Sequence, residues 1–320
     1  MDDQAYDPAF AQAVLDGLAA TPKRLSSQYF YDAAGDRLFQ QIMASPEYYL
    51  TDCERASLQE HSDAMAVALS PGGPFELLEL GAGDGSKIGF LLDALHRREA
   101  EFIYRPLDIS AHVLQLLAER VRPGRPWLDV QPLAVNYMDW LAQPRRPGIR
   151  RVFAFMGSNL GNFSEAVAIA FLAALRGAMT AGDFLLVGLD LKKDPAIIRA
   201  AYNDSAGITA AFNLNLLERI NRELAADFDI ARFQHCPSYD PKSGAARSFL
   251  ASCCDQQVYL AALDRRFHFA AGERMQMEIS QKYDAALIDR ITQAAGFAVA
   301  HRYYDERRWF TNQLWVPAGG

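Results

Sequence analysis

A glycine-rich run stands between a predicted strand and a predicted helix, where a ligand-binding loop is expected. The run Glu79–Ser86 reads ELGAGDGS, with a glycine at every second position from Gly81. Glycine permits a tight turn and lets a ligand approach the backbone closely. Asp108 ends the next predicted strand, 23 residues after Gly85 (108 − 85). A carboxylate at that position accepts both hydroxyls of a ribose, so the two features predict a nucleoside-containing cofactor.

The loop leaves three functional classes open. A dinucleotide-binding loop has the spacing G-x-G-x-x-G, and its third glycine is replaced here by Ser86. The spacing G-x-G-x-G after an acidic residue resembles motif I of the Rossmann-like methyltransferases. Asp108 suits either cofactor. A methyltransferase, a nicotinamide-dependent oxidoreductase and a catalytically silent binding protein therefore remain alternatives at this point.

Two further runs place polar side chains where a substrate would bind. Residues 157–163 (GSNLGNF) follow the predicted strand Arg151–Met156, at the carboxyl-end edge where parallel sheets bind ligands. Glu278 and Ser280 stand two apart in a predicted strand, so both side chains project from one face. Each has a structural alternative: Asn162 would serve as the N-cap of the following helix, and Glu278 as a solvated strand residue.

The elements that position these residues alternate between strand and helix. Such alternation predicts an α/β fold with a parallel, doubly wound sheet. The predicted strands are Phe75–Leu80, Phe102–Ile109, Trp127–Val135, Arg151–Met156 and Asp183–Asp190, and the predicted helices are Lys87–His96, Ala111–Val121 and Glu165–Met179.

The pattern changes after this region, which predicts a second domain of the α+β class. Residues 195–226 have a continuous helical pattern, and the strand-like segments 228–239, 247–260 and 267–282 suggest an antiparallel sheet. A helix over 284–295 and a strand pair over 297–304 and 309–316 follow. We expect one domain to comprise 56–191 plus 282–320. The second would comprise 1–55 plus 192–281 and begin as an aromatic-rich packing arm.

Several runs, taken together over nearly the whole chain, resemble the histidine-specific methyltransferases of ergothioneine biosynthesis. These runs are YFYD, PEYY, LELGAGDGSK, GSxxGNF, AYND, NLLxRxNRELxADFD and ExSxK, in that order. The resemblance implies a Rossmann-like S-adenosylmethionine-dependent methyltransferase domain and a second domain that recognises the amino acid. It also implies the activity: trimethylation of the α-amino group of L-histidine to hercynine.

The resemblance assigns one group of residues to S-adenosylmethionine, with Asp108 on the ribose and Asn136 and Tyr137 flanking the adenine. Asn136 stands where the family frequently has an aspartate, and its amide oxygen still accepts a hydrogen bond from the exocyclic amine. The expected cofactor-binding residues are Gly81, Ala82, Gly83, Lys87, Asp108, Asn136 and Tyr137.

A second group surrounds the amino and carboxyl groups of the substrate. By resemblance, Asn162 and Tyr202 hold the carboxylate, Gly157 borders the amine, and Tyr31 and Phe39 surround it. Aromatic faces suit a methylated ammonium. Tyr31, Asn162 and Tyr202 are the expected catalytic residues, since in-line methyl transfer depends mainly on positioning.

A third group surrounds the substrate ring. By resemblance, Tyr48 and Thr209 lie near the imidazole, and Glu278 and Ser280 bind its two nitrogens. A carboxylate accepts one N–H, and a hydroxyl donates or accepts at the other nitrogen. Ser248 stands where the family usually has a methionine bordering the ring, which leaves the site larger or more polar. A different amino acid or a histidine derivative is therefore the alternative substrate.

Composition sets further expectations. Half of the 320 residues are apolar and the formal net charge is −7, so we expect a globular protein without a nucleic-acid partner. The four cysteines form no CxxC pair and are interpreted as reduced core thiols, and the six scattered histidines suggest no metal site. The acidic start and the lack of a long apolar run predict a cytoplasmic protein with no membrane contact. We expect a monomer.

Overall fold

The computed structural model describes residues 6–83 and 85–319, and the chain forms two compact units, each built from two stretches. The large unit comprises Leu50–Lys192 and the chain from Gln281 onward; the small unit comprises the chain up to Tyr49 together with Lys193–Ser280. The first expected boundary, at residues 55 and 56, falls inside the helix α3 (Leu50–Leu69). The helix continues past that point, and its apolar residues Leu58, Met65, Ala66 and Leu69 pack in the core of the large unit.

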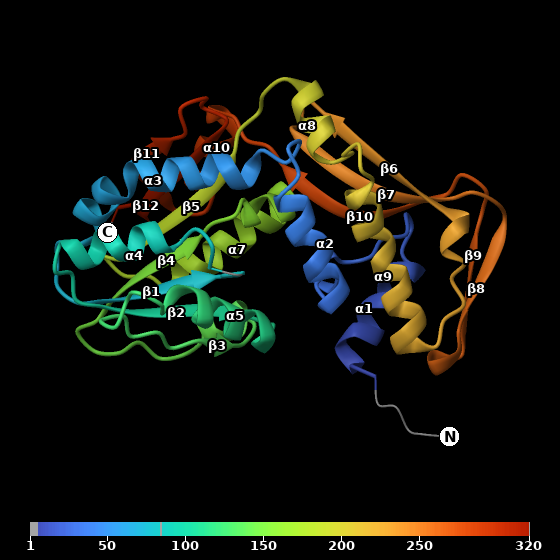
Figure 1. Ribbon diagram of the computed structural model, residues 1–320, viewed down its shortest axis with the longest axis horizontal. Coiled ribbons are helices and arrows are strands. Elements are labelled where there is room, and N and C mark those ends of the chain that lie inside the picture. Colours follow the sequence, from blue (N-terminus) through green and yellow to red (C-terminus); the bar gives the residue numbers. More distant parts are fainter. Residues whose placement is uncertain (1–5, 84, 320) are drawn as a thin grey trace. The chain divides into compact units, whose positions relative to one another are not determined.

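A seven-stranded sheet forms the centre of the large unit, in the order β11-β12-β5-β4-β1-β2-β3 (Figure 1). The predicted α/β class is confirmed: the five strands from β5 to β3 are parallel, and β12 and β11 extend the sheet antiparallel. The strands are β1 (Phe75–Leu80), β2 (Phe102–Asp108), β3 (Leu133–Ala134), β4 (Arg150–Phe155), β5 (Phe184–Asp190), β11 (Phe297–Tyr304) and β12 (Phe310–Pro317).

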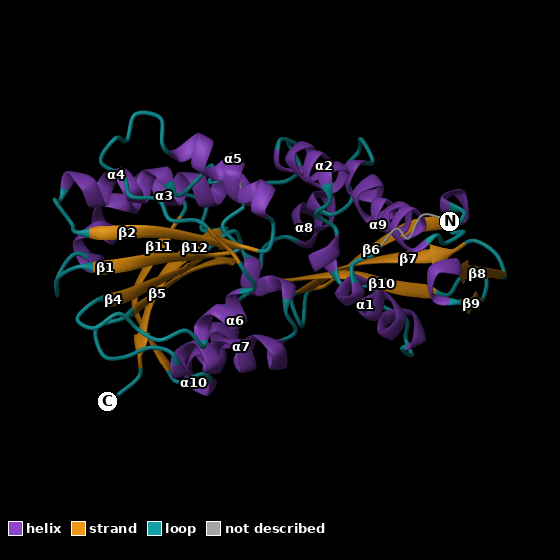
Figure 2. Cartoon of the chain, turned by 90° about the horizontal axis from the view of Figure 1, so that it is seen from below, coloured by secondary structure: helices purple, strands orange, loops and turns teal. Residues whose placement is uncertain are grey.

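Helices cover both faces of this sheet (Figure 2). Side chains of successive residues in a strand point to opposite faces of the sheet, so Leu77 of β1 packs in the core on one face and Leu78 in the core on the other. One face carries α3, α4 (Gly89–Arg97) and α5 (Ala111–Val121), and the other carries α6 (Tyr137–Leu141), α7 (Glu165–Gly177) and α10 (Ala285–Ala294). The carboxyl ends of β1, β2 and β4 therefore share one edge.

The predicted strand Trp127–Val135 is largely wrong. Only Leu133–Ala134 pairs as β3, after one isolated bridge at Val130. Pro132 interrupts the ladder because it has no N–H to donate. Trp127 instead stacks on the ring of His96, at 3.9 Å between the ring centroids.

The small unit combines helices with two small sheets. The predicted antiparallel pairing is present between β6 and β7 and between β8 and β9. Residues 6–49 pack in this core, as the expected packing arm would, and they do so mainly as helices. The elements are α1 (Pro8–Ala19), α2 (Ala33–Met43), α8 (Pro195–Ala201), α9 (Ile208–Leu224), β6 (Phe233–Asp240), β7 (Ala245–Ser252), β8 (Gln256–Leu260), β9 (Arg265–Phe269) and β10 (Arg274–Gln281).

The continuous helix expected over 195–226 is wrong, because the chain turns between α8 and α9. Asp204 makes the turn favourable by capping α9: its two carboxylate oxygens accept the N–H groups of Ile208 at 2.8 Å and Thr209 at 2.7 Å. Gly207 precedes the helix with φ +73°. Two helices separated by such a turn can show the same apolar periodicity as one long helix, so the sequence pattern does not reveal the break.

The cysteines are free, but the expectation that they lie in the core is wrong for three of them. Cys53 is buried, Cys236 and Cys254 are half-buried, and Cys253 is exposed. Cys253 and Cys254 follow the end of β7 in a bend, where the chain has left the core.

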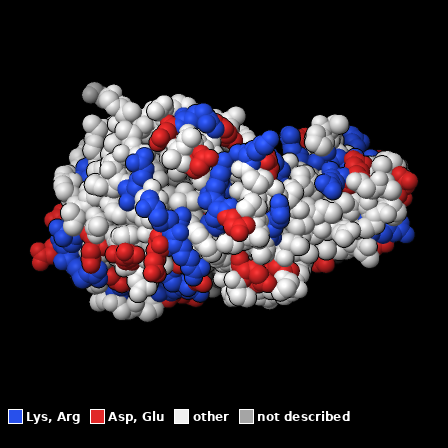
Figure 3. Space-filling view, turned by 90° about the horizontal axis from the view of Figure 1, so that it is seen from above, with Lys and Arg blue, Asp and Glu red and all other residues white. Residues whose placement is uncertain are grey.

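Within the described residues, no helix is long and apolar enough to cross a membrane. Basic and acidic side chains are interspersed on the face shown in Figure 3.

Candidate active site

The glycine loop turns sharply away from the end of β1, and its glycines have different tasks. Gly81, Gly83 and Gly85 have φ values of +64°, +56° and +67°. A Cβ on Gly85 would lie 2.8 Å from Cγ of Leu117, so that glycine is required for packing on α5. No described atom lies within 4 Å of a Cβ built on Gly83, so that glycine leaves room beside the loop. Asp84 lies outside the described residues.

Asp108 is held at the carboxyl end of β2, beside the loop. Its carboxylate accepts the N–H of Ser110 at 3.0 Å and, over a longer 3.4 Å, the N–H of Gly83. Burial raises the pKa of Asp108, and these backbone N–H groups oppose the rise. The carboxylate is therefore fixed in direction and joined to the loop, as binding to a ribose requires.

Asn136 and Tyr137 begin α6 on the same side of the sheet as Asp108. The side-chain oxygen of Asn136 caps the helix by accepting the N–H of Met138 at 2.9 Å. The ring of Tyr137 packs edge-on against Phe171. Burial raises the pKa of Tyr137, and the nearby charge of Asp108 adds to the rise. Tyr137 therefore lies near Asp108.

The turn after β4 is strained and tied to the glycine loop. Gly157 and Ser158 are both left-handed, with φ values of +71° and +58°. A residue with a side chain costs about 1–2 kcal/mol in that conformation and persists only when its surroundings impose it. Asn159 supplies one restraint, since its side-chain amide donates to the carbonyl of Gly81 at 3.2 Å.

Glu54 on α3 is the second restraint, and sequence reasoning missed it. One oxygen of its buried carboxylate accepts a hydrogen bond from the N–H of Gly157 at 2.8 Å. The other oxygen accepts a hydrogen bond from the ammonium of Lys87 and forms an ion pair with it. A Cβ on Gly188 of β5 would lie 2.5 Å from the first oxygen, so only glycine leaves space for it. The sequence does contain one signal that could have identified Glu54. It stands four residues after Leu50, so a carboxylate lies within the apolar stripe of the helix, where an apolar residue is expected.

The large unit therefore brings most of its expected cofactor residues to one edge. One hydrogen bond joins the glycine loop to Asp108, and another joins the loop to the turn that begins at Gly157. Glu54 then connects this turn to Lys87, through a hydrogen bond on one side and an ion pair on the other. Asn162 ends a short 3-10 helix, Asn159–Asn162, and is exposed. Ser164 occupies the N-cap position of α7, so Asn162 does not have the structural role considered as its alternative.

Aromatic side chains expected around the substrate form a contiguous set in the small unit. Ring centroids lie 5.5 Å apart for Tyr31 and Phe39, 6.4 Å for Phe39 and Tyr48, and 6.5 Å for Tyr48 and Tyr202. Phe212 of α9, which was not predicted, contacts both Tyr31 and Phe39. Tyr31 remains 40% exposed, so this set presents an accessible aromatic face.

The same set reaches the residues expected at the substrate ring. The hydroxyl of Tyr202 donates to Oγ of Ser280 at 2.7 Å, in a buried position. Glu278 lies two residues earlier on β10 and is half-buried. Tyr202 therefore fixes the hydroxyl beside the carboxylate, joining two residues that the resemblance assigns to different ends of the substrate.

Ser248 and Thr209 have polar partners of their own. The N–H of Thr209 donates to Asp204. Oγ of the buried Ser248 lies 3.2 Å from Nε2 of His235, which the sequence did not single out. Burial lowers the pKa of His235 to about 4, against a smaller opposing effect of Asp204. A hydroxyl thus stands where a methionine is usual, with a neutral imidazole beside it.

The cofactor expected from the sequence fits the residues present in the large unit. The directed carboxylate of Asp108 suits a ribose diol, and the space beside Gly83 admits a ligand against the backbone. The ammonium of Lys87 lies at the same edge and suits a carboxylate.

Comparisons with known proteins find similar sequences over nearly the whole chain. The family model described as "Histidine-specific methyltransferase, SAM-dependent" matches residues 10–317. The chain is 38% identical to a histidine N-alpha-methyltransferase of Mycobacterium tuberculosis, covering 98% of this chain and 94% of the relative. It is 37% identical to that of Mycolicibacterium smegmatis, covering 93% and 91%. Ergothioneine biosynthesis protein 1 of Neurospora crassa is 31% identical over 86% of this chain and 31% of its own length.

Replacing Glu54 by glutamine tests the buried ion pair. Glutamine keeps an acceptor for Gly157 but leaves the ammonium of Lys87 without its carboxylate, so we expect the free energy of unfolding to fall by at least about 2 kcal/mol. Urea unfolding of Glu54→Gln measures the change. Glu60→Gln, at an exposed position of the same helix, is the control and should stay within about 0.5 kcal/mol of wild type. Equal stability of the two variants would contradict the role of Glu54.

His235 should make stability depend on pH. The pKa of His235 is about 4 in the folded chain and 6.5 for an unperturbed histidine, which represents the unfolded chain. Between pH 4 and pH 6.5 the unfolded chain therefore binds a proton that the folded chain does not. Stability should therefore fall as the pH is lowered from 6.5 towards 4. Urea unfolding at pH 7 and pH 5 should show a smaller loss for His235→Gln than for wild type. His112→Gln, at an exposed position, should retain the full loss; an unchanged loss in His235→Gln would rule out the assignment.

Proposed function

Because the chain belongs to the family of S-adenosylmethionine-dependent, histidine-specific methyltransferases, we propose that it methylates the α-amino nitrogen of L-histidine. The proposal extends to three successive transfers that give hercynine, a step of ergothioneine biosynthesis. Relatives that carry the names of histidine N-alpha-methyltransferase and ergothioneine biosynthesis protein 1 support it.

One observation carries the substrate assignment: a carboxylate and an oriented hydroxyl lie on one face of β10, next to an aromatic set. Glu278 would accept the N–H of one imidazole nitrogen, and Ser280 would pair with the other. The bond from Tyr202 sets the direction of the Ser280 hydroxyl before substrate arrives. An imidazole edge has one donor and one acceptor, so a carboxylate–hydroxyl pair matches it, while an apolar side chain would leave both groups unpaired.

Cofactor binding is the task of the large unit. S-adenosylmethionine supplies an electrophilic methyl group on its sulfonium. Asp108 would hold the ribose, Asn136 and Tyr137 would flank the adenine, and Lys87 would hold the carboxylate of the methionine part. Glu54 keeps Lys87 and Gly157 in place, so that the binding edge is formed in advance.

Positioning of the amine is the main catalytic task that remains for the chain. The amine must be neutral to attack, and each transfer releases one proton. Asn162 would hold the substrate carboxylate, which fixes the α-carbon and therefore the direction of the amine. Tyr202 would join it by turning its single hydroxyl proton from Ser280 to the carboxylate once substrate is bound. The faces of Tyr31 and Phe39 would stabilise the increasing positive charge of the methylated nitrogen. The trimethylated product is a fixed cation, which aromatic faces accommodate without a hydrogen bond.

A second candidate substrate is favoured by one departure. Ser248 places a hydroxyl where the family usually has an apolar methionine, and the neutral imidazole of His235 lies beside it. Such a polar pair would stabilise an additional polar group on the substrate ring. A histidine derivative or another amino acid with a polar side chain is therefore the alternative.

The test is a mass-spectrometric assay of the purified enzyme with S-adenosylmethionine and each of the twenty amino acids. We expect a dominant product three methyl groups heavier than histidine. Glu278→Gln keeps the size of the side chain but removes the charge. It should lower kcat/KM for histidine about tenfold or more, because hydrogen bonds to charged groups contribute about 1.5–3 kcal/mol.

The matched control is Gln276→Ala, at the next position along the same face of β10, which should change kcat/KM little. Preferred methylation of another amino acid would support the second candidate and refute histidine as the substrate. No methylation of any of the twenty amino acids by an enzyme that still binds S-adenosylhomocysteine would refute histidine and every other standard amino acid, and a histidine derivative would be the one candidate substrate left to assay.

A further inference from the structure

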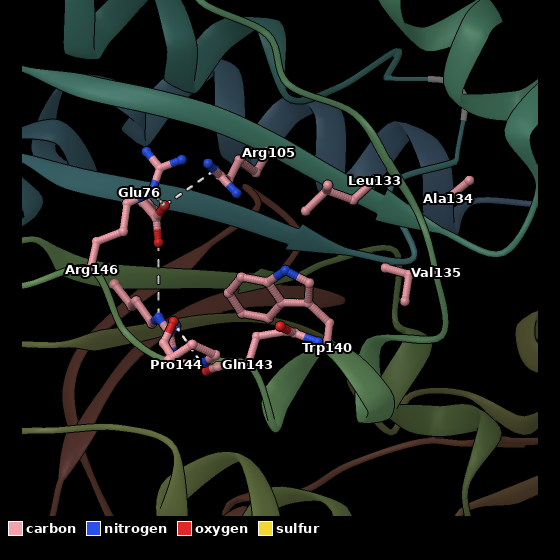
Figure 4. A pocket seen from close by; sticks show the side chains of 10 residues that line it. Glu76, Arg105, Leu133, Ala134, Val135, Trp140, Gln143, Pro144 and Arg146 are labelled. Atoms are coloured by element: carbon pink, nitrogen blue, oxygen red, sulfur yellow. Dashed lines mark hydrogen bonds and ion pairs between the residues drawn. The ribbon is translucent and has the colours of Figure 1, made fainter.

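A pocket of about 410 Å³ opens on the large unit, on the face of the sheet that carries α6 and α7 (Figure 4). It lies over the first halves of β1 and β4, where Glu76 and Arg151 are register partners. The pocket exists because α6 has only five residues, and the loop that follows it covers the strands without a helix. No helix covers this part of the sheet, and the strand residues Glu76, Arg105 and Arg151 that line the pocket there are charged.

The charges in this pocket do not balance. Glu76 is the single carboxylate among its described lining residues, and three guanidinium groups surround it. Their Nε atoms lie 3.2 Å (Arg105), 3.4 Å (Arg146) and 3.9 Å (Arg151) from the carboxylate oxygens. Figure 4 shows the Glu76 carboxylate among these guanidinium groups, with a dashed line to Arg105. The lining therefore carries an excess of two positive charges.

Two of these guanidinium groups are also buried without full compensation. The side chains of Arg105 and Arg151 are 11% and 2% exposed. Within the described chain, neither Nε has a hydrogen-bond acceptor in good geometry. Burial lowers the pKa of Arg151, and the neighbouring Arg145 adds to that, which Glu76 only partly offsets. Buried charge of this kind is stabilised by a partner of opposite sign.

We propose that this pocket binds a small phosphate monoester. A phosphate dianion matches the excess of two charges and can accept from several guanidinium groups at once. Leu133 and Val135 form an apolar wall that suits the organic part of such an ester. The indole of Trp140 lies beneath the Arg151 guanidinium, which is 4.8 Å from the centre of the indole ring, and holds that group in the pocket.

The guanidinium groups of this site lie over the first halves of β1 and β4, away from the residues that follow the carboxyl ends of these strands. Its apolar wall at Leu133 and Val135 ends directly before Asn136, so the pocket neighbours the cofactor edge without including Asp108 or the glycine loop.

Isothermal titration calorimetry tests the proposal, with inorganic phosphate and phenyl phosphate as probes. The protein is first saturated with S-adenosylhomocysteine to occupy the cofactor site, and sodium chloride at equal ionic strength is the reference. We expect saturable binding of both probes and tighter binding of phenyl phosphate, because its ring would cover the apolar wall. The readout is binding and does not depend on the methylation activity.

Variants locate the binding. Arg146 is half-exposed, so Arg146→Ala should fold normally and weaken binding at least fivefold. Arg98→Ala, at an exposed position outside the pocket, should leave binding unchanged. Glu76→Gln removes the competing anion and should tighten binding, which a purely structural ion cluster would not do. Absence of saturable binding in wild type, or equal affinity in Arg146→Ala and Arg98→Ala, would overturn the proposal.

Discussion

A buried carboxylate is the constraint on which the cofactor edge depends. Glu54 joins the backbone of Gly157 to the ammonium of Lys87, and β5 has a glycine at position 188 where any side chain would displace it. A buried charge is destabilising unless it is paired, so α3, β4 and β5 hold one another in a single arrangement. The left-handed conformation of Ser158 is retained because its neighbours are fixed on both sides.

The sequence predicted those features that depend on local spacing. The glycine loop, Asp108 and the Glu278–Ser280 pair follow from strand and turn periodicity, and the resemblance supplied their roles. Glu54 was missed because its partners are 33 and 103 residues away, and no spacing rule records such contacts. The break before α9 was missed for a different reason: Asp204 restarts the helix without changing the apolar pattern.

The two units offer different chemistry, as the proposed function requires. The large unit offers a directed carboxylate, open space beside a glycine and an ammonium, which suit a nucleoside and an amino-acid carboxylate. The small unit offers aromatic faces and a carboxylate–hydroxyl pair, which suit an ammonium and an imidazole. Family membership decides the ambiguity of the loop in favour of S-adenosylmethionine over a nicotinamide dinucleotide, which the glycine spacing alone could not do.

Hydrogen exchange at the turn after β4 tests the role of Glu54 most directly. Glu54→Ala removes the acceptor of the Gly157 amide, so this amide should exchange on the order of tenfold faster or more, while the amides of β4 keep their protection. That result would show that the carboxylate holds the turn. Unchanged exchange of Gly157 in Glu54→Ala would mean that the turn is held by other contacts, and would contradict the account.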